Sequence, residues 1–92
     1  MSTSLSIVIV NWNSGELLRE CLASIAPSQA ALAGAAQLHR VVIVDNGSSD
    51  GSQRVEDLPG APIEWIQNSE NRGFAAACNQ GAAACRTDLI LF

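Results

Sequence analysis

Two short apolar runs rich in β-branched residues restrict the folds that this chain can adopt. Residues 5–10 read LSIVIV and residues 41–44 read VVIV, and neither run alternates between apolar and polar side chains. Such runs are typical of strands that are covered on both faces, as in a parallel sheet. Parallel neighbours need a crossover connection, which is usually a helix. The sequence therefore predicts an α/β fold built on a parallel sheet.

The connection between these two strands begins with a helical pattern. Apolar residues recur at helical spacing over 17–25, and Asn13 with Glu16 three residues later resembles a helix-start capping box. We expect Pro27 to end this helix at the preceding residue, because a proline inside a helix removes a hydrogen bond and clashes with the preceding turn. The small and polar residues 27–37 are expected to form a surface loop.

The rest of the chain continues the alternation of helix and strand. The expected segments are a short helix over 48–58, a strand near a sheet edge over 63–67, a helix over 74–85 and a strand over 88–92. The inward face of the last helix is expected to carry Phe74, Cys78, Gly81 and Cys85. The pattern βαβαβαβ predicts a Rossmann-like three-layer sandwich with right-handed crossovers and the strand order 3-2-1-4. Residues 1–92 form one domain in this interpretation.

Composition excludes several classes of function. The five basic residues are all arginine and the formal charge is −4, so the chain has no basic stripe and nucleic-acid binding is not expected. No apolar run approaches the roughly 20 residues of a membrane span, and no secretory signal is visible. The three cysteines form no CxxC pair, which argues against a disulfide framework or a zinc site and favours a reduced, cytoplasmic protein. Cys78 and Cys85 are expected to be small core residues.

Polar and aromatic residues follow the first three predicted strands, where ligands bind in open parallel sheets. The segments are Asn11-Trp12-Asn13, Asp45-Asn46-Gly47-Ser48 and residues 68–74, which read NSENRGF. Carboxylates and amides can pair with the edge of a base, an aromatic ring can stack on it, and a helix start opened by glycine can approach a pyrophosphate. These loops therefore predict a nucleotide site at one rim of the sheet.

Each of these residues also has a structural interpretation. Trp12 fits a packed aromatic as well as a stacking platform. Asp45 fits a residue that caps its own turn, and Asn79 fits a partly buried amide satisfied by the backbone. If Asp45 is a ligand contact, Asp45→Ala is expected to lower nucleotide affinity far more than stability, whereas an equal loss of both would favour the turn cap.

Three common site types are not supported by the sequence. The turn after the first strand reads NWNSG, which is not the GxGxxG of a classical dinucleotide site, and no GxxxxGK[ST] is present. The single histidine, His39, precedes the second strand at the end opposite to the polar rim, so a Ser-His-Asp hydrolase is not expected. His39 is expected at the surface or at the start of a strand.

The motifs VDNGSSDGS at 44–52 and NRGFAAACNQG at 71–81, in this order and spacing, resemble family 2 glycosyltransferases. The resemblance runs from about Ser4 to Phe92 and is to the N-terminal part of the inverting GT-A catalytic domain, especially its rhamnosyltransferase-like members. It implies a nucleotide-sugar-dependent enzyme that transfers a sugar from a nucleotide diphosphate to an acceptor hydroxyl with inversion.

The resemblance also implies roles for nine residues. Val10, Asn11 and Trp12 would hold the nucleoside together with Asp45, Asn46 and Ser48, and Trp12 would lie at the base. Family members often have two acidic residues at 45–46, so either Asp45 or Asn46 would make the base contact. Gly73 and Phe74 would lie near the pyrophosphate and sugar, and Asn79 would tie the last helix to the second loop.

The family's metal and base motifs are expected after Phe92, so no catalytic or metal-binding residue is assigned within 1–92. The resemblance implies a divalent cation, Mg²⁺ or Mn²⁺, in a longer protein and none bound by this chain, which would be inactive as a transferase alone. The implied acceptor is a glycan or a lipid-linked glycan of cell-wall or polysaccharide synthesis, made in the cytoplasm or at the inner face of the membrane. Two alternatives are a non-catalytic nucleotide-binding or regulatory module and an interaction domain that forms oligomers through the exposed fourth strand.

Overall fold

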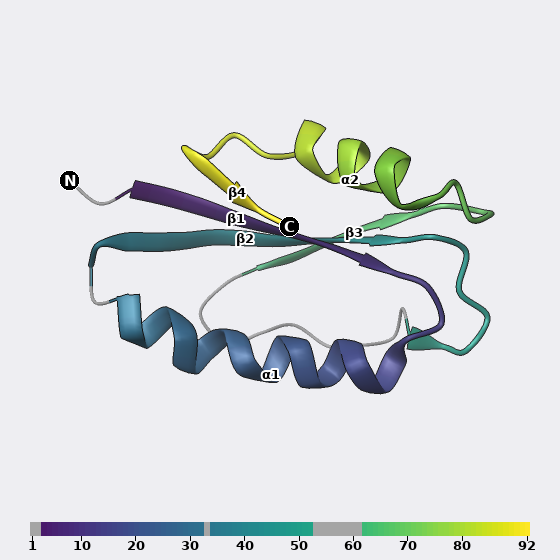
Figure 1. The fold of residues 1–92 in the computed structure, drawn as a ribbon, viewed down its shortest axis with the longest axis horizontal. Helices are drawn as coiled ribbons and strands as arrows, with labels where there is room; N and C mark the ends of the chain where they lie inside the picture. The colour runs from purple at the N-terminus through teal and green to yellow at the C-terminus, as the bar shows by residue number, and fades with distance from the viewer. Residues whose placement is uncertain (1–2, 33, 53–61) are drawn as a thin grey trace.

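The computed structural model describes residues 3–32, 34–52 and 62–92, which form a parallel four-stranded sheet with the order β3-β2-β1-β4. The elements are β1 (Thr3–Asn11), α1 (Gly15–Leu32), β2 (Ala36–Asp45), β3 (Ile63–Gln67), α2 (Phe74–Ala83) and β4 (Leu89–Leu91). Figure 1 shows the sheet between the two helices. The predicted α/β class, parallel sheet and strand order are confirmed. The helix expected over 48–58 lies largely outside the described residues.

The lower face of the sheet in Figure 1 is covered by α1. Leu18, Leu22 and Ile25 of α1 are buried in one cluster with Val41 and Ile43 of β2. These helix residues have the spacing that places side chains on a single face. The first helix of the predicted pattern therefore packs as its apolar spacing requires.

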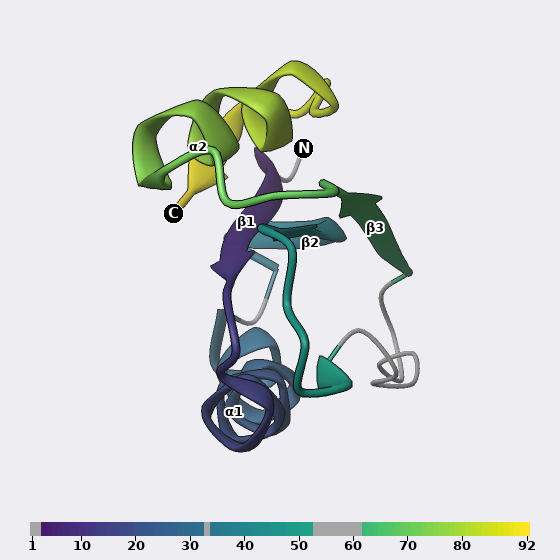
Figure 2. The same cartoon turned by 90° about the vertical axis from the view of Figure 1, so that its right-hand side faces the viewer.

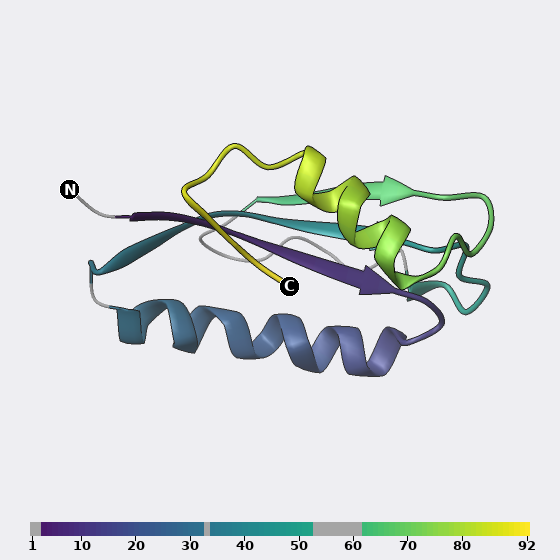
Figure 3. The ribbon, with the colours of Figure 1, turned by 45° about the horizontal axis from the view of Figure 1, so that its top comes forward.

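The opposite face of the sheet is covered by α2, which lies across β1 and β2 (Figure 3). Val42 and Val44 of β2 and Val8 of β1 are buried there with Ala77 and Cys85. Successive side chains of a strand point to opposite faces, so β2 supplies Val41 and Ile43 to one layer and Val42 and Val44 to the other. This two-sided burial explains why the run VVIV has no polar alternation.

The end of α1 differs from the prediction. The helix continues through Pro27 to Leu32, and β2 already begins at Ala36, so the surface loop expected after the proline is wrong. Ser28, directly after Pro27, donates a hydrogen bond from its hydroxyl to the carbonyl of Ser24 at 2.8 Å, one turn earlier. A proline removes a single backbone donor, and the alanine-rich residues that follow have the highest helix propensity.

The close approach of α2 to the sheet depends on Gly81. A Cβ added at Gly81 would lie 2.4 Å from Cγ1 of Val8 and 3.3 Å from Cγ2 of Val44. Gly81 and Cys85 are buried as expected, and Cys78 is half-buried. The expected inward position of Phe74 is wrong, because this side chain is 70% exposed and Ala77 takes the buried position in the first turns.

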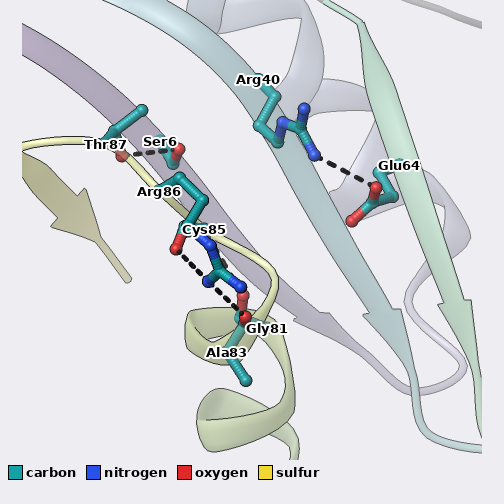
Figure 4. A network of polar contacts seen from close by, with 8 residues as sticks. All are labelled: Ser6, Arg40, Glu64, Gly81, Ala83, Cys85, Arg86 and Thr87. Carbon is teal, nitrogen blue, oxygen red and sulfur yellow. Dashed lines mark hydrogen bonds and ion pairs between the residues drawn. The ribbon is translucent and has the colours of Figure 1, made fainter.

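Polar contacts between the first half of β1 and the segment before β4 hold the fourth strand in register. Asp88 accepts hydrogen bonds from the backbone N–H and the hydroxyl of Ser4, at 2.9 and 3.0 Å. The Thr87 hydroxyl donates to Ser6 at 2.8 Å, and Ser6 is fully buried (Figure 4). These contacts compensate for the small number of backbone pairs that a three-residue strand can make.

An apolar groove of about 390 Å³ lies between α1, β1 and β4, and Ile25, Leu91 and Phe92 are among the residues that line it. Leu89, Leu91 and Phe92 are each more than half exposed. The exposed fourth strand expected from the sequence is therefore present. Oligomer formation through it stays a prediction.

Candidate functional site

The loops that follow β1, β2 and β3 meet at one rim of the sheet. Figure 2 looks toward the carboxyl ends of these strands, so the three connections face the viewer. Backbone hydrogen bonds continue the sheet into the rim, from the Asn46 N–H to the Asn11 carbonyl at 2.8 Å and from the Asn68 N–H to the Asp45 carbonyl at 2.9 Å. The convergence predicted from the parallel strands is confirmed.

A buried cluster of side chains lies under the first two loops. The Asn11 amide donates to Asp45 Oδ1 at 2.8 Å, to Ser52 Oγ at 2.8 Å and to Ser48 Oγ at 3.2 Å. Asp45 Oδ2 accepts from the Ser48 N–H at 2.9 Å and from the Gln67 amide at 2.7 Å. Asn11, Asp45 and Ser52 are each at most 1% exposed. The strands therefore deliver these groups to one another, and Asp45 makes the turn-capping contact that the sequence left open.

Asp45 remains ionised in this cluster. Burial acts to raise the pKa of the Asp45 carboxyl, but the hydrogen bonds from Ser48, Gln67 and Asn11 together outweigh it and hold the pKa below its ordinary value. The carboxylate fixes the orientation of the Asn11 amide, because only the NH₂ group can face it. The Asn11 Oδ1 atom is buried and accepts no hydrogen bond from the described residues. An acceptor is therefore left free beneath the rim.

The second loop also caps α1. The side-chain oxygen of Asn13 accepts from the Ser49 N–H at 2.8 Å, and the Asp50 carboxylate accepts from the Gly15 N–H at 3.2 Å. The expected capping box at Asn13 is wrong, because Asn13 bonds to the second loop and Asp50 supplies the carboxylate at the helix start. Hydrogen bonds from the Ser52 hydroxyl and N–H hold the pKa of the Asp50 carboxyl below its ordinary value.

The change of stability at low pH tests the contacts of three carboxylates. Folding depresses the pKa values of Asp45, Asp50 and Asp88, in the last case through hydrogen bonds from Ser4. A depressed pKa gives stability that is complete above the unfolded value of 3.8 and is lost as the pH falls through the folded value. We expect the urea midpoint of unfolding to be constant between about pH 7 and pH 5 and to fall below about pH 4. A midpoint at pH 3 equal to that at pH 6 would contradict these contacts.

A second buried cluster joins the third loop to α2. The Asn46 amide donates to the Gly73 carbonyl at 3.2 Å, and its oxygen accepts from the Asn68 amide at 3.0 Å and the Arg72 N–H at 3.3 Å. Asn68 in turn exchanges two hydrogen bonds with Gln80 of α2, at 2.8 and 2.9 Å. The connection from α2 to the second loop was expected at Asn79. It is made instead by Gln80, through Asn68. Asn79 lies on the exposed side of the helix, where the described residues give its side chain no hydrogen bond.

Two aromatic side chains lie uncovered at the same rim. Trp12 is 53% exposed and Phe74 is 70% exposed, while Val10 is half-buried and packs with the α2 layer. Trp12 is therefore not part of the packed core, and its role as a rim aromatic or as a stacking platform stays a prediction. Helix α2 starts at Phe74 after Gly73, which makes no side-chain cap, so its first N–H groups are open to an anion.

The sequence analysis did not single out Ser52, Gln67, Asn68 and Gln80. Gln67 and Asn68 end a predicted strand at the rim, so their position was the available signal. Ser52 and Gln80 had no such signal, because nothing local shows that Ser52 folds back under Asn11 or that Gln80 faces Asn68. His39 is exposed in β2 at the end away from the rim, as predicted.

The described residues contain no group of three His, Cys, Asp or Glu side chains that could hold a metal ion. The resemblance implies the cation only in a longer protein, so the cation stays a prediction and no step is assigned to it here. Within the same ranges, no helix combines the length and the apolar character needed to cross a membrane.

The parallel sheet, the paired polar loops and the open helix start define an α/β protein whose polar loops lie at the carboxyl ends of its strands, where ligands bind in open parallel sheets. The sequence profile of glycosyl transferase family 2 matches residues 6–92. The chain therefore belongs to glycosyl transferase family 2, an enzyme family.

Two curated relatives illustrate the relationship. A "Pre-mycofactocin glycosyltransferase" of Mycobacterium tuberculosis H37Rv is 42% identical over 55 residues, which cover 58% of this chain and 12% of that protein. The "Uncharacterized glycosyltransferase YfnE" of Bacillus subtilis 168 is 30% identical over 89 residues, 95% of this chain and 21% of that protein. The chain thus spans about a fifth or less of the length of these relatives. No solved structure matches it significantly.

Proposed function

We propose that this chain is the donor-nucleotide-binding part of a glycosyltransferase that moves a sugar from a nucleotide diphosphate to an acceptor hydroxyl with inversion. The observation that carries the proposal is the arrangement of the rim. Two buried polar clusters hold the loops in place, and Trp12, Phe74 and the uncapped start of α2 remain exposed above them. A ligand site needs this combination of rigid support and accessible groups.

The chemistry of the exposed groups fits a nucleoside diphosphate. The face of the Trp12 indole is available to stack on a base, since aromatic faces bind other π systems and apolar rings. The open N–H groups at the start of α2 suit a pyrophosphate, because a helix N-terminus carries a partial positive charge. Ser48 is half-buried beside Trp12, and its Oγ accepts from the Asn13 N–H at 2.9 Å. The roles of Asp45 and Asn46 in base contact stay predictions.

The transfer itself needs groups besides those at the rim. An acceptor hydroxyl must lose a proton to a general base, and the leaving diphosphate must have its charge compensated. We assign neither role to a described residue, and we expect the 92-residue chain to bind nucleotide without transferring sugar. In the longer protein, a divalent cation and a carboxylate base supplied by other segments complete the site. Its expected acceptor is a glycan or lipid-linked glycan, handled in the cytoplasm or at the inner membrane face.

Tryptophan fluorescence tests the nucleotide site. Titration with UDP, dTDP and GDP is expected to quench the emission of Trp12 with at least one of them, because a stacked base covers its exposed ring. Trp65, half-buried in β3, gives a background that should not change. Calorimetric titration, which does not depend on tryptophan emission, is expected to show that Trp12→Ala weakens binding about fivefold or more, since stacking of a base on an aromatic ring is worth about 1–3 kcal/mol.

Leu17→Ala is the matched control, because Leu17 is another large apolar side chain that is more than half exposed, at 68%, on the first turn of α1. We expect it to bind as the unchanged chain does. Equal affinities for Trp12→Ala and the unchanged chain would remove Trp12 from the site. A longer protein that binds nucleotide but transfers no sugar would favour the non-catalytic nucleotide-binding alternative.

A further inference from the structure

The amide at position 46 is the central element of the cluster that joins β2, the third loop and α2. Asn46 is only 2% exposed, and both ends of its side chain are used. Its NH₂ donates to the Gly73 carbonyl, and its oxygen accepts from the Arg72 N–H. The Asn46 side chain therefore bonds to the backbone on both sides of the peptide bond between Arg72 and Gly73. A carboxylate of the same size could accept from Arg72 but could not donate to Gly73.

The backbone of the third loop fixes which end of Asn46 faces which partner, because the Arg72 N–H can only donate and the Gly73 carbonyl can only accept. The Asn46 oxygen then also accepts from the Asn68 amide at 3.0 Å, and Asn68 forms a reciprocal pair with Gln80. The three amides form a continuous chain from α2 to the backbone of the loop, and a connected, fully satisfied buried network holds one arrangement.

The backbone at this point has a conformation that needs such support. Gly73 has φ 85° and immediately precedes α2, so its direction sets where the first N–H groups of the helix point. The second and third loops are also in close contact, because a Cβ added at Gly47 would lie 3.0 Å from the Glu70 backbone. The loop is thus held at its middle by packing and at its end by the Asn46 side chain.

We propose that Asn46, bonded to Asn68 and through it to Gln80, is a positioning residue that sets the backbone of Arg72 and Gly73 before any ligand binds, and that this chain needs an amide rather than a carboxylate at position 46. Its consequence for nucleotide affinity rests on the proposed function, because Gly73 directly precedes the first N–H groups of α2, which are those offered to the pyrophosphate. The proposal makes Gln80, on the far side of the cluster, a contributor to the same loop geometry.

The variant Asn46→Asp tests the requirement for a donor. When the introduced carboxyl is ionised it meets the Gly73 carbonyl as a second acceptor, and when it is protonated it can donate again. We expect the protection factors against hydrogen exchange of the Arg72 amide and of the Gly73 amide, which itself donates to Asn71, to fall about tenfold at pH 8, because the loss of the hydrogen bond from position 46 to the Gly73 carbonyl loosens this segment. They should return toward those of the unchanged chain at a pH that protonates the introduced carboxyl.

The comparison must be made with the unchanged chain at each pH. The charged groups around position 46 are the Asp45 carboxylate on β2 and the side chains of Glu70 and Arg72 in the third loop, and they are common to both proteins. Gln37→Glu is the matched control, since it makes the same amide-to-carboxylate change at an exposed position near the other end of β2. It should leave both amides unchanged at either pH.

Two results would overturn the proposal. One is protection in Asn46→Asp equal to that of the unchanged chain at both pH values, and the other is a loss at pH 8 that is not recovered at a pH that protonates the introduced carboxyl. If Asn46→Asp does not fold, Gln80→Glu replaces it, because a carboxylate there cannot donate to Asn68 and should lower protection at Arg72 by a smaller factor.

The same samples are titrated with UDP, dTDP and GDP. Weaker binding by Asn46→Asp at pH 8, restored when the introduced carboxyl is protonated, supports the link between loop geometry and affinity, and unchanged affinity despite a loosened loop contradicts that link. If the unchanged chain binds none of the three while the exchange pattern is as expected, the proposed function fails and the positioning role of Asn46 stands.

Discussion

Asp45→Ala is expected to lower the free energy of unfolding by about 3 kcal/mol, because it removes the acceptor that three donors of the buried cluster share. The amides of Asn11 and Gln67 and the N–H of Ser48 all donate to this carboxylate, and Asp45 itself is fully buried. Urea unfolding at pH 7 measures the loss. The sequence alone led to the expectation that affinity would fall far more than stability, whereas the buried cluster leads us to expect losses of both.

Two controls separate the effect of the buried charge from that of losing any carboxylate. Glu20→Ala removes an exposed carboxylate from α1 and should change stability by less than about 0.5 kcal/mol. Asp45→Asn keeps the size of the side chain but turns one acceptor into a donor. Its loss of stability should therefore lie between those of Glu20→Ala and Asp45→Ala. A stability loss for Asp45→Ala no larger than that for Glu20→Ala would contradict the structural role of the cluster.

Gly81→Val is expected to cost about 3 kcal/mol through overpacking between α2 and the sheet. Even the first carbon of a side chain at Gly81 would lie 2.4 Å from Cγ1 of Val8, and valine at position 8 is stiff about its first side-chain bond. Differential scanning calorimetry or urea unfolding gives the value. Ala83→Val, at an exposed position of the same helix, is the matched control and should cost less than about 1 kcal/mol.

A double-mutant cycle identifies Val8 as the residue that Gly81 accommodates. Val8→Ala alone leaves a cavity in the α2 layer, and Gly81→Ala alone forces α2 outward. Together they should cost less than the sum of the single losses by about 1 kcal/mol or more, because the new methyl group enters the space that valine vacates. Strict additivity would show that Gly81 is not limited by its contact with Val8.

The fold was largely predictable because burial on two faces leaves a direct pattern in the strands. The unbroken runs at 5–10 and 41–44 place β1 and β2 in the middle of the sheet, and both prove to be the central strands. The end of α1 was not predictable from Pro27. A proline inside a helix costs a few kcal/mol of helix stability. The helical preference of the following alanines and the packing of the preceding turns can outweigh that cost.

The place of the site was predictable, and the orientation of its side chains was not. Parallel strands bring their carboxyl ends together by topology alone, so the rim follows from the strand assignment. Whether Asp45 faces a ligand or its neighbours depends on contacts such as Asn11 with Ser52, whose partners lie 41 residues apart in the sequence. The same reason accounts for Gln80, whose partner Asn68 belongs to a different element.

The location of bound nucleotide tests the account most directly. Two-dimensional ¹H–¹⁵N spectra of the chain are recorded as UDP, dTDP or GDP is added to millimolar concentration. The account predicts that at least one nucleotide shifts the amide signals at the rim, around Trp12, Ser48 and Phe74, and leaves those around His39 and Phe92 unchanged. Shifts confined to the far end of the sheet or to the apolar groove, or no shifts with any of the three, would contradict it.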